Sequence, residues 1–255
     1  TWDELNAAAE KLQAAGIIPF AHGGQAWQDA TVFEAVAMGI GGNNYYKNCY
    51  VDLKESCLRS ETTVKVFDQM RKLQGFTDEG SPGRDWNVAT GMVIEGKAGF
   101  QIMGDWAKGE FTAAGKVPGV DYYCAATPSN NGYLYNVDSF IFYKSSDPDK
   151  QAGQKLLAKL MMGKNFQKVF NLYKGSIPAR LDVSMDEFDK CAKTSNADIK
   201  TAGASGGLVP SFAHGMAQGN TMKAALQDII TEHFNSDMSS VDAANALADS
   251  VLANM

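Results

Sequence analysis

The stretch from Gly96 to Trp106 places the strongest constraint on the fold of this chain. Lys97–Met103 ends in apolar positions and is predicted to form a short buried strand, after which the chain turns at Asp105. Trp106 stands where this strand ends and where a helix over Ala107–Ala114 is predicted to begin. Because open α/β sheets bind ligands at the carboxyl ends of their strands, an indole beside a carboxylate here predicts a binding site. The simpler interpretation of the spacing alone is that Trp106 is a core residue.

A second predicted strand ends in side chains of the same kind. Ile17–Ala21 is a short apolar stretch that runs into a glycine-containing loop, where an unusual backbone close to a ligand is possible. The candidate binding residues of this loop are His22, Gln25 and Trp27. The structural alternatives are that His22 is a loop histidine with its bonds satisfied and that Trp27 covers the core.

The rest of the chain alternates helices with a few strands, which favours an α/β or α+β fold over a barrel. Helical spacing of apolar residues predicts helices over residues 1–15, 29–38, 61–73, 85–95, 149–162, 165–173, 184–193, 216–234 and 239–252. Asp29 is predicted to cap the second of these helices, and Ser184 the seventh. Further strands are predicted at 122–126 and 133–144, on either side of a turn at 129–132. An extended stretch from Leu208 leads to His214.

Composition excludes several classes of protein. The net charge of −6 and the absence of any basic run argue against nucleic-acid binding. No apolar stretch approaches the roughly 18 residues that a membrane span needs, so no direct membrane insertion is expected. The first residues predict a helix capped by Thr1, not a signal peptide. The values of 45% hydrophobic and 20% charged residues are typical of a globular domain with a real core.

Motifs for catalysis or for cofactors are not present in the sequence. The four cysteines form no C-x-x-C pair, the three histidines form no H-E-x-x-H, and no phosphate-binding loop occurs, so neither a metal nor a cofactor is expected. A local disulfide between Cys49 and Cys57 is one of the three pairings that four cysteines allow. A glycoside hydrolase would need two carboxylates, for which Asp105 with Asp138, or Asp29 with Glu34, are the candidates. A fragment that binds nothing small is a third interpretation.

Four ordered motifs carry a resemblance to a known family. They are Thr-Trp-Asp-Glu-Leu at 1–5, Gly-Gly-Gln-Ala-Trp at 23–27, the stretch 96–106, and Gly-Ser-Ile-Pro-Ala-Arg at 175–180. In this order they resemble the extracellular sugar-binding proteins of ABC importers, in particular the periplasmic glucose- and mannose-binding members of the group that includes maltose-binding protein. The resemblance runs the length of the chain.

The resemblance implies a periplasmic binding protein fold, an α/β fold of two lobes with the sugar in the cleft between them. Residues 1–123 and 165–255 would form the two parts of the C-terminal lobe, and 125–162 a segment of the N-terminal lobe. Family members carry a further segment before the first helix, with the signal peptide and most of the N-terminal lobe. That missing N-terminal lobe is therefore an expected partner.

The resemblance also implies a function without catalysis. The expected protein is periplasmic, binds a monosaccharide, most simply glucose, and delivers it to a membrane ABC permease. Indoles would cover the apolar face of the sugar, while polar side chains would pair its hydroxyl groups. The residues at matching positions are Trp106, Trp27, Lys174, His214, Asn136 and Asp138, with Asp105, Gln25 and His22 as further candidates.

Overall fold

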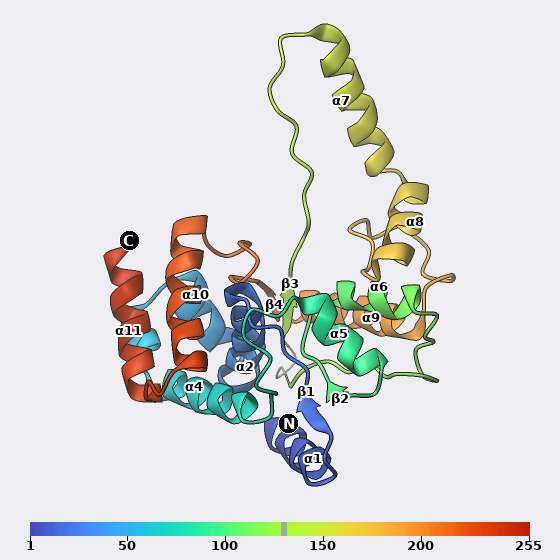
Figure 1. The fold of residues 1–255 in the computed structure, drawn as a ribbon. Helices are drawn as coiled ribbons and strands as arrows, with labels where there is room; N and C mark the ends of the chain where they lie inside the picture. Colours follow the sequence, from blue (N-terminus) through green and yellow to red (C-terminus); the bar gives the residue numbers. More distant parts are fainter. Residues whose placement is uncertain (129–131) are drawn as a thin grey trace. The chain divides into compact units, whose positions relative to one another are not determined.

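A computed structural model describes residues 1–128 and 132–255, and the chain divides into two compact units (Figure 1). Unit 1 consists of Thr1–Gly104, Ala125–Asn136 and Asp198–Met255, and unit 2 of Asp105–Cys124 and Val137–Ala197. Unit 2 thus contains parts of both predicted lobes, and the lobe boundaries stay a prediction. Of the turn predicted at 129–132, residues 129–131 lie outside the described residues.

Unit 1 begins with a helix and a pair of short strands. The helix α1 (Trp2–Ala14) has Thr1 as its N-cap, as its sequence predicts, and the structure adds a capping box with Glu4. The strand β1 (Ile18–Phe20) runs parallel to β2 (Ala98–Phe100), with Ile18 opposite Ala98. The strand expected over 97–103 therefore forms, but only its first part is paired.

The central helix of unit 1 is longer than its sequence suggests. The helix α2 (Ala26–Tyr46) begins at Gln25 as N-cap and bends where Gly42 takes φ 73°, which glycine adopts without a Cβ clash. The expectation that Asp29 caps this helix is wrong, because Asp29 is buried inside α2 and bonded elsewhere. A π-helical turn (Lys47–Val51) follows and contains Cys49, which is bonded to Cys57.

Among the described residues, five more helices, the end of a sixth and a second strand pair complete unit 1. The helices α4 (Glu61–Gln74) and α10 (Asn220–Asn235) pack on α2, and α5 (Trp86–Ile94) leads into β2 (Figure 1). The helix α11 (Ser240–Ala253) packs on α4 and α10, and the short α3 (Glu55–Leu58) packs on α11. Apart from α5, these helices contribute to one large apolar cluster with fully buried Phe33, Leu226 and Phe67. The strands β3 (Tyr133–Tyr135) and β4 (Leu208–Pro210) pair in parallel.

Two strand predictions fail in part or entirely. The strand expected over 133–144 stops at Tyr135, and its apolar part at 139–143 pairs with no other described strand. Phe140, Ile141 and Tyr143 are consequently exposed. Residues 122–126 form no strand, because Tyr122 makes only an isolated bridge with Pro118 and Cys124 is held in a disulfide.

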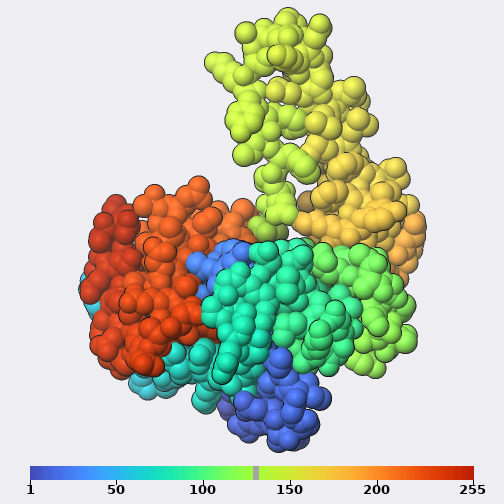
Figure 2. All heavy atoms as spheres, viewed as in Figure 1, coloured from blue at the N-terminus to red at the C-terminus, as the bar shows by residue number. Residues whose placement is uncertain are grey.

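Unit 2 is built from short and loosely packed helices. They are the 3₁₀ turn η2 (Asp105–Ala107), α6 (Lys108–Ala113), α7 (Pro148–Met161), α8 (Lys164–Lys174) and the first half of α9 (Lys190–Ala204). Side chains of Gln151 and Gln154 on α7 donate to backbone carbonyls of the extended stretch before it, and together these residues form a slender arm (Figure 2). None of the described helices is long and apolar enough to cross a membrane.

The start of α9 differs from its prediction. The helix expected over 184–193 begins only at Lys190 and continues to Ala204. The Asp189 carboxylate accepts a hydrogen bond from the Ala192 N–H at 2.8 Å, which marks the helix start. The Ser184 hydroxyl instead accepts from the N–H two residues on, so it closes a turn.

Candidate functional site

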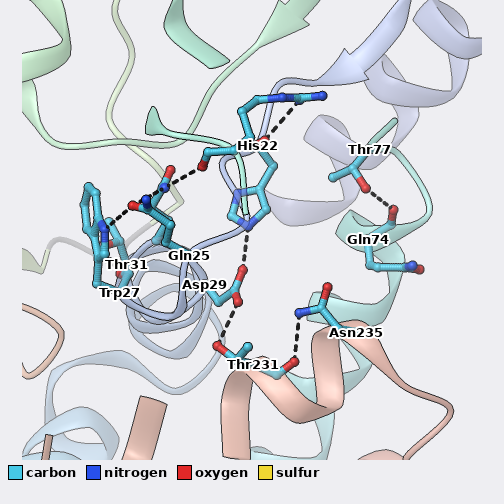
Figure 3. Close-up of polar contacts among 11 residues, drawn as sticks. His22, Gln25, Trp27, Asp29, Thr31, Gln74, Thr77, Thr231 and Asn235 are labelled. Atoms are coloured by element: carbon cyan, nitrogen blue, oxygen red, sulfur yellow. Dashed lines mark hydrogen bonds and ion pairs between the residues drawn. The ribbon is translucent and has the colours of Figure 1, made fainter. Parts of the chain in front are cut away.

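The loop after β1 presents Trp27 in a chain of hydrogen bonds. The indole Nε1 of Trp27 donates to Gln25 Oε1 at 2.8 Å (Figure 3). Gln25 Nε2 in turn donates to Asp85 at 2.5 Å. The Trp27 ring also meets the His214 ring edge-on, with centroids 6.0 Å apart. The indole is therefore held in a fixed orientation at the first turn of α2.

His214 reaches Trp27 from the end of another strand. It follows β4, and its Nε2 lies 3.2 Å from the hydroxyl of Thr31, one turn after Trp27 on α2. Asn136 directly follows β3, and β3 and β4 are parallel, so both residues stand at the carboxyl edge of this pair. The structure thus brings Gln25, Trp27 and His214 together within unit 1, with Asn136 following the neighbouring strand.

His22 takes the structural role that its sequence also allowed. Its ring is buried, its Nε2 lies 2.7 Å from the Asp29 carboxylate, and Thr231 on α10 donates to the other oxygen of that carboxylate at 2.8 Å (Figure 3). Phe20 and Phe234 cover its ring faces, with centroids 5.2 and 5.0 Å away. Since no face of the imidazole is open, we leave His22 out of the proposed ligand contacts.

A second cluster forms within unit 2. Asp105 and Trp106 lie in η2, and Lys174 is the last residue of α8, where its ammonium group pairs with the Asp138 carboxylate. Gly175 then takes φ 91°, and a Cβ there would lie 2.6 Å from the Gly109 nitrogen. The end of α8 therefore packs directly on the start of α6, close to Asp105.

The electrostatics of this cluster centre on Asp105. Burial raises the pKa of the Asp105 carboxyl, while the positive charges of Lys108 and Lys174 and a hydrogen bond from the Ile177 N–H act against this shift. The cluster combines a positive donor, two carboxylate acceptors and a half-buried indole. These are the groups that pair sugar hydroxyls and cover a sugar face.

The geometry also bears on a metal site and on the two candidate carboxylate pairs. Among residues 1–128 and 132–255, no group of three His, Cys, Asp or Glu side chains could hold a metal ion. Of the two carboxylate pairs, Asp29 and Glu34 are both buried and hydrogen-bonded inside unit 1. Asp138 of the other pair is engaged by Lys174.

Sequence reasoning named Glu34 only as one carboxylate of a possible catalytic pair, and it missed the contacts of Glu34 and Thr31 with the loop that carries His214. Thr31 and Glu34 follow Trp27 at helical spacing, and both contact the loop that carries His214. The available signal was a glutamate within the apolar run from Ala30 to Met38, where a charge needs a partner. Asp85, which anchors Gln25, gave no such signal.

Comparison with known proteins places the chain in a family. Residues 1–161 match the family described as bacterial extracellular solute-binding protein. The chain belongs to this family. Relatives named probable sugar-binding periplasmic protein are 47% identical over 98% of this chain in Brucella suis and 44% identical over 98% in Rhizobium meliloti.

Solved structures of solute-binding proteins share the fold. A Streptococcus pneumoniae solute-binding protein in complex with the blood group A-trisaccharide matches with a TM-score of 0.71 at 19% identity, covering 100% of this chain and 64% of the other. A chitin oligosaccharide binding protein matches with a TM-score of 0.72 at 16% identity, covering 98% and 63%. These likenesses confirm the predicted fold class.

The solute-binding chain spans about three fifths of its relatives, since it covers 59% of the Brucella suis protein and 60% of the Rhizobium meliloti protein. The resemblance stated from the four motifs is confirmed, and so is the periplasmic localisation that it implied. The family and these relatives are binding proteins by description, not enzymes. The individual site residues stay predictions.

Proposed function

We propose that this solute-binding chain is the larger part of a periplasmic receptor that binds a monosaccharide, with glucose as the expected sugar, and delivers it to an ABC permease. The observation that carries the proposal is that each unit gathers an indole with polar side chains. Trp27 stands with Gln25 and His214 in unit 1, and Trp106 with Lys174 and two carboxylates in unit 2.

The residue types suit a hexose. An indole covers the apolar C–H face of a pyranose, while ammonium, carboxylate and imidazole groups pair the hydroxyl groups that both donate and accept. Each neutral hydrogen bond contributes about 0.5–1.5 kcal/mol net, and each bond to a charged group about 1.5–3 kcal/mol. A few such contacts are enough for micromolar binding, about −8.2 kcal/mol.

The proposed receptor includes a lobe that residues 1–255 do not complete. The side chains of Phe140, Ile141 and Leu156 are 58%, 78% and 60% exposed, although their spacing marks them as core residues. We propose that the segment 125–162 belongs to this lobe and that the part of the receptor expected before residue 1 covers these side chains. The length by which the relatives exceed this chain supports the idea.

Delivery to a permease is supported by a further relative. A Pyrococcus horikoshii protein that is 34% identical over 91% of this chain is named an uncharacterized ABC transporter extracellular-binding protein. Closure of two lobes around a ligand is a common way for such proteins to signal occupancy to a partner. The proposed receptor would present its closed form to the permease.

A sugar panel tests the proposal directly. Glucose, galactose, mannose and maltose are titrated against the chain while tryptophan fluorescence and thermal unfolding are followed, and a sugar at a hundredfold its Kd stabilises by about 2.7 kcal/mol. Trp106→Ala and Trp27→Ala are expected to abolish or strongly weaken the response. Trp2→Phe is the matched control, because Trp2 is buried in the apolar core of unit 1.

The same panel separates the alternatives. A response that arises only after the preceding segment of the Brucella suis relative is added supports the incomplete lobe. A folded chain that responds to no sugar in either form overturns the proposed function and favours an inert fragment. Turnover of a nitrophenyl glycoside would favour the glycoside hydrolase.

A further inference from the structure

Glu34 is a buried carboxylate whose partners all lie around the loop that carries His214. Its side chain is 3% exposed. One carboxylate oxygen accepts from the Ser211 hydroxyl at 2.6 Å. The other accepts from the Tyr46 hydroxyl at 3.0 Å and from the Ala213 N–H at 3.3 Å. Three donors from two segments thus converge on a single acidic group of α2.

These bonds continue directly to the backbone of His214. The Ser211 oxygen that donates to Glu34 also accepts from the His214 N–H at 3.1 Å. The Tyr46 hydroxyl, which also lies 3.1 Å from the Pro210 carbonyl, accepts from the Phe212 N–H at 3.1 Å. Each residue from Ser211 to His214 is therefore within one or two hydrogen bonds of the Glu34 carboxylate.

The residues of α2 that contact His214 and its loop lie on one face of the helix. Trp27, Thr31 and Glu34 lie at positions i, i+4 and i+7, which share one face of a helix. Trp27 meets the His214 ring edge-on, Thr31 bonds its Nε2, and Glu34 fixes the backbone that carries it. One helix face therefore sets both the ring and the main chain of His214.

We propose that Glu34 is a positioning residue of the sugar site, which holds the turn from Ser211 to His214 on α2 and so presents the His214 ring beside Trp27. This proposal rests on the proposed function, because it assigns Glu34 a role through His214. Glu34 itself is enclosed, so it acts through His214.

The hydrogen-bond donors around the Glu34 side chain favour a carboxylate over a glutamine amide at this position. Three donors and no acceptor surround the two oxygens, and a glutamine amide would turn two of its own N–H groups toward them. Burial raises the pKa of Glu34 to about 7, even though these donors stabilise the charged form. Burial and the neighbouring Glu34 raise the pKa of Tyr46, so its phenol stays a neutral donor. Burial of an acid costs desolvation free energy, and its presence here suits a role in orienting the loop that carries His214.

Histidine NMR reads the positioning without any sugar. The chain has three histidines, so the ring C–H signals of His214 can be assigned with His214→Gln. Glu34→Gln is expected to shift or broaden the His214 signals and to leave those of His22 in place. Ser211→Ala removes the hydroxyl that links Glu34 to the His214 N–H, while it keeps the Tyr46 and Ala213 contacts. It should give the same change in the His214 signals with a smaller loss of stability than Glu34→Gln.

Asp29→Asn is the matched control. Asp29 is an equally buried acid on α2, but its partners are His22 and Thr231. This variant is expected to move the His22 signals and to leave those of His214 unchanged. If Asp29→Asn moved His214 as strongly as Glu34→Gln does, the cause would be general loosening of α2, and the proposal would fail.

Sugar affinity provides the second readout. With the sugar that gives a response in the wild-type chain, Glu34→Gln and Ser211→Ala should each weaken binding about tenfold, while Asp29→Asn leaves the Kd unchanged. Folded variants with wild-type His214 signals and a wild-type Kd would overturn the positioning role. If the wild-type chain binds no sugar either alone or with the preceding segment of the Brucella suis relative, the proposed function fails, and the His214 signals still decide what Glu34 does.

Discussion

Each of the two units is stabilised internally in a different way. Among the described residues, both clusters of buried apolar side chains lie in unit 1. Unit 2 relies on single links: the disulfide between Cys124 and Cys191, the ion pair of Lys108 with Asp189 at 2.8 Å, and a stacked pair of Phe111 on Tyr122 at 4.1 Å. Unit 1 is stabilised by its core, and unit 2 by cross-links.

Two helices show the contrast most clearly. The helix α2 buries a continuous run of residues from Gln28 to Met38, whereas α7 buries only Met161 of its fourteen residues. Yet α7 carries leucines at helical spacing, as a core helix does. The difference shows that the apolar stripe of α7 is largely exposed among the described residues, which is the basis for the incomplete lobe proposed above.

Removal of the disulfide in unit 2 should have the largest effect. Cys124 and Cys191 are 67 residues apart, so the bond restricts a long loop of the unfolded chain and contributes about 4 kcal/mol. Cys49 and Cys57, eight residues apart in unit 1, contribute about 2.5 kcal/mol on the same basis. We expect the double variant Cys124→Ala/Cys191→Ala to lose hydrogen-exchange protection mainly in peptides from 105–124 and 137–197.

The location of the loss decides this prediction. Because the units need not unfold together, exchange is read peptide by peptide instead of from one unfolding midpoint. The variant Cys49→Ala/Cys57→Ala is the control and should affect the peptides of unit 1. Equal loss in both units after removal of the Cys124–Cys191 bond would show that unit 2 shares the stability of the core, and the comparison would break.

Local signals in the sequence predicted much of the fold. The N-cap at Thr1 and the amphipathic pattern of α4 were sufficient, because each acts within a few residues. The predicted cap at Asp29 failed since its partners are His22 and Thr231, the latter 202 residues away. The strand expected over 133–144 failed because its apolar part pairs with no described strand.

The candidate site was predictable to the same extent. Strand exits pointed to Gln25, Trp27, Asp105 and Trp106, and in the structure these residues follow the ends of β1 and β2. The supports of the site were not predictable, because Glu34 and Ser211 meet across 177 residues of chain. A buried acid shows in the sequence that a partner is needed, but not which residue provides it.

A matched pair of leucines tests the difference between a covered and an uncovered helix. Leu226 on α10 is fully buried, whereas Leu156 on α7 is 60% exposed. Leu226→Ala should lower the free energy of unfolding by about 3 kcal/mol, while Leu156→Ala should change it by less than about 0.5 kcal/mol. Denaturant unfolding of both variants gives the comparison directly.

The same two leucine variants give a stricter test in the presence of the segment that is proposed to cover α7. With the preceding segment of the Brucella suis relative bound, Leu156→Ala is expected to weaken the association measurably, and Leu226→Ala to leave it unchanged. A large cost of Leu156→Ala in the chain alone would mean that α7 already packs on something in solution, such as a second copy. That result would remove the argument for an uncovered lobe.

The smallest effect concerns acid, which should act on the core of unit 1. His233 is buried on Phe67 with ring centroids 4.8 Å apart, and neither ring nitrogen has a hydrogen-bond partner among the described residues. Burial lowers the pKa of His233 from 6.5 to about 4, and the positive charge of Arg71 adds to this shift. The unfolded chain therefore binds a proton on this residue at a higher pH than the folded chain does.

The sign of the pH effect follows from that difference. Between pH 6.5 and 4 the unfolded state holds more protons on His233, so stability is full above this window and falls as the pH drops through it, by on the order of 2 kcal/mol. Glu34 acts in the opposite sense, because its pKa of about 7 lets the folded state hold the extra proton. His233→Leu removes the contribution of the histidine and keeps that of Glu34. Urea unfolding of the variant and the wild-type chain at pH 7 and pH 4.5 therefore gives the free energy that belongs to His233 as a difference between the two proteins.

In unit 2 the exposed Asp182 has its pKa lowered by Arg180 and Lys164, so its ion pairs persist through this window. In unit 1 the contributions of His233 and Glu34 oppose each other, so the test is the difference between His233→Leu and the wild-type chain. The variant should gain stability relative to the wild-type chain from pH 7 to pH 4.5, and a difference that does not change with pH would contradict the role of His233.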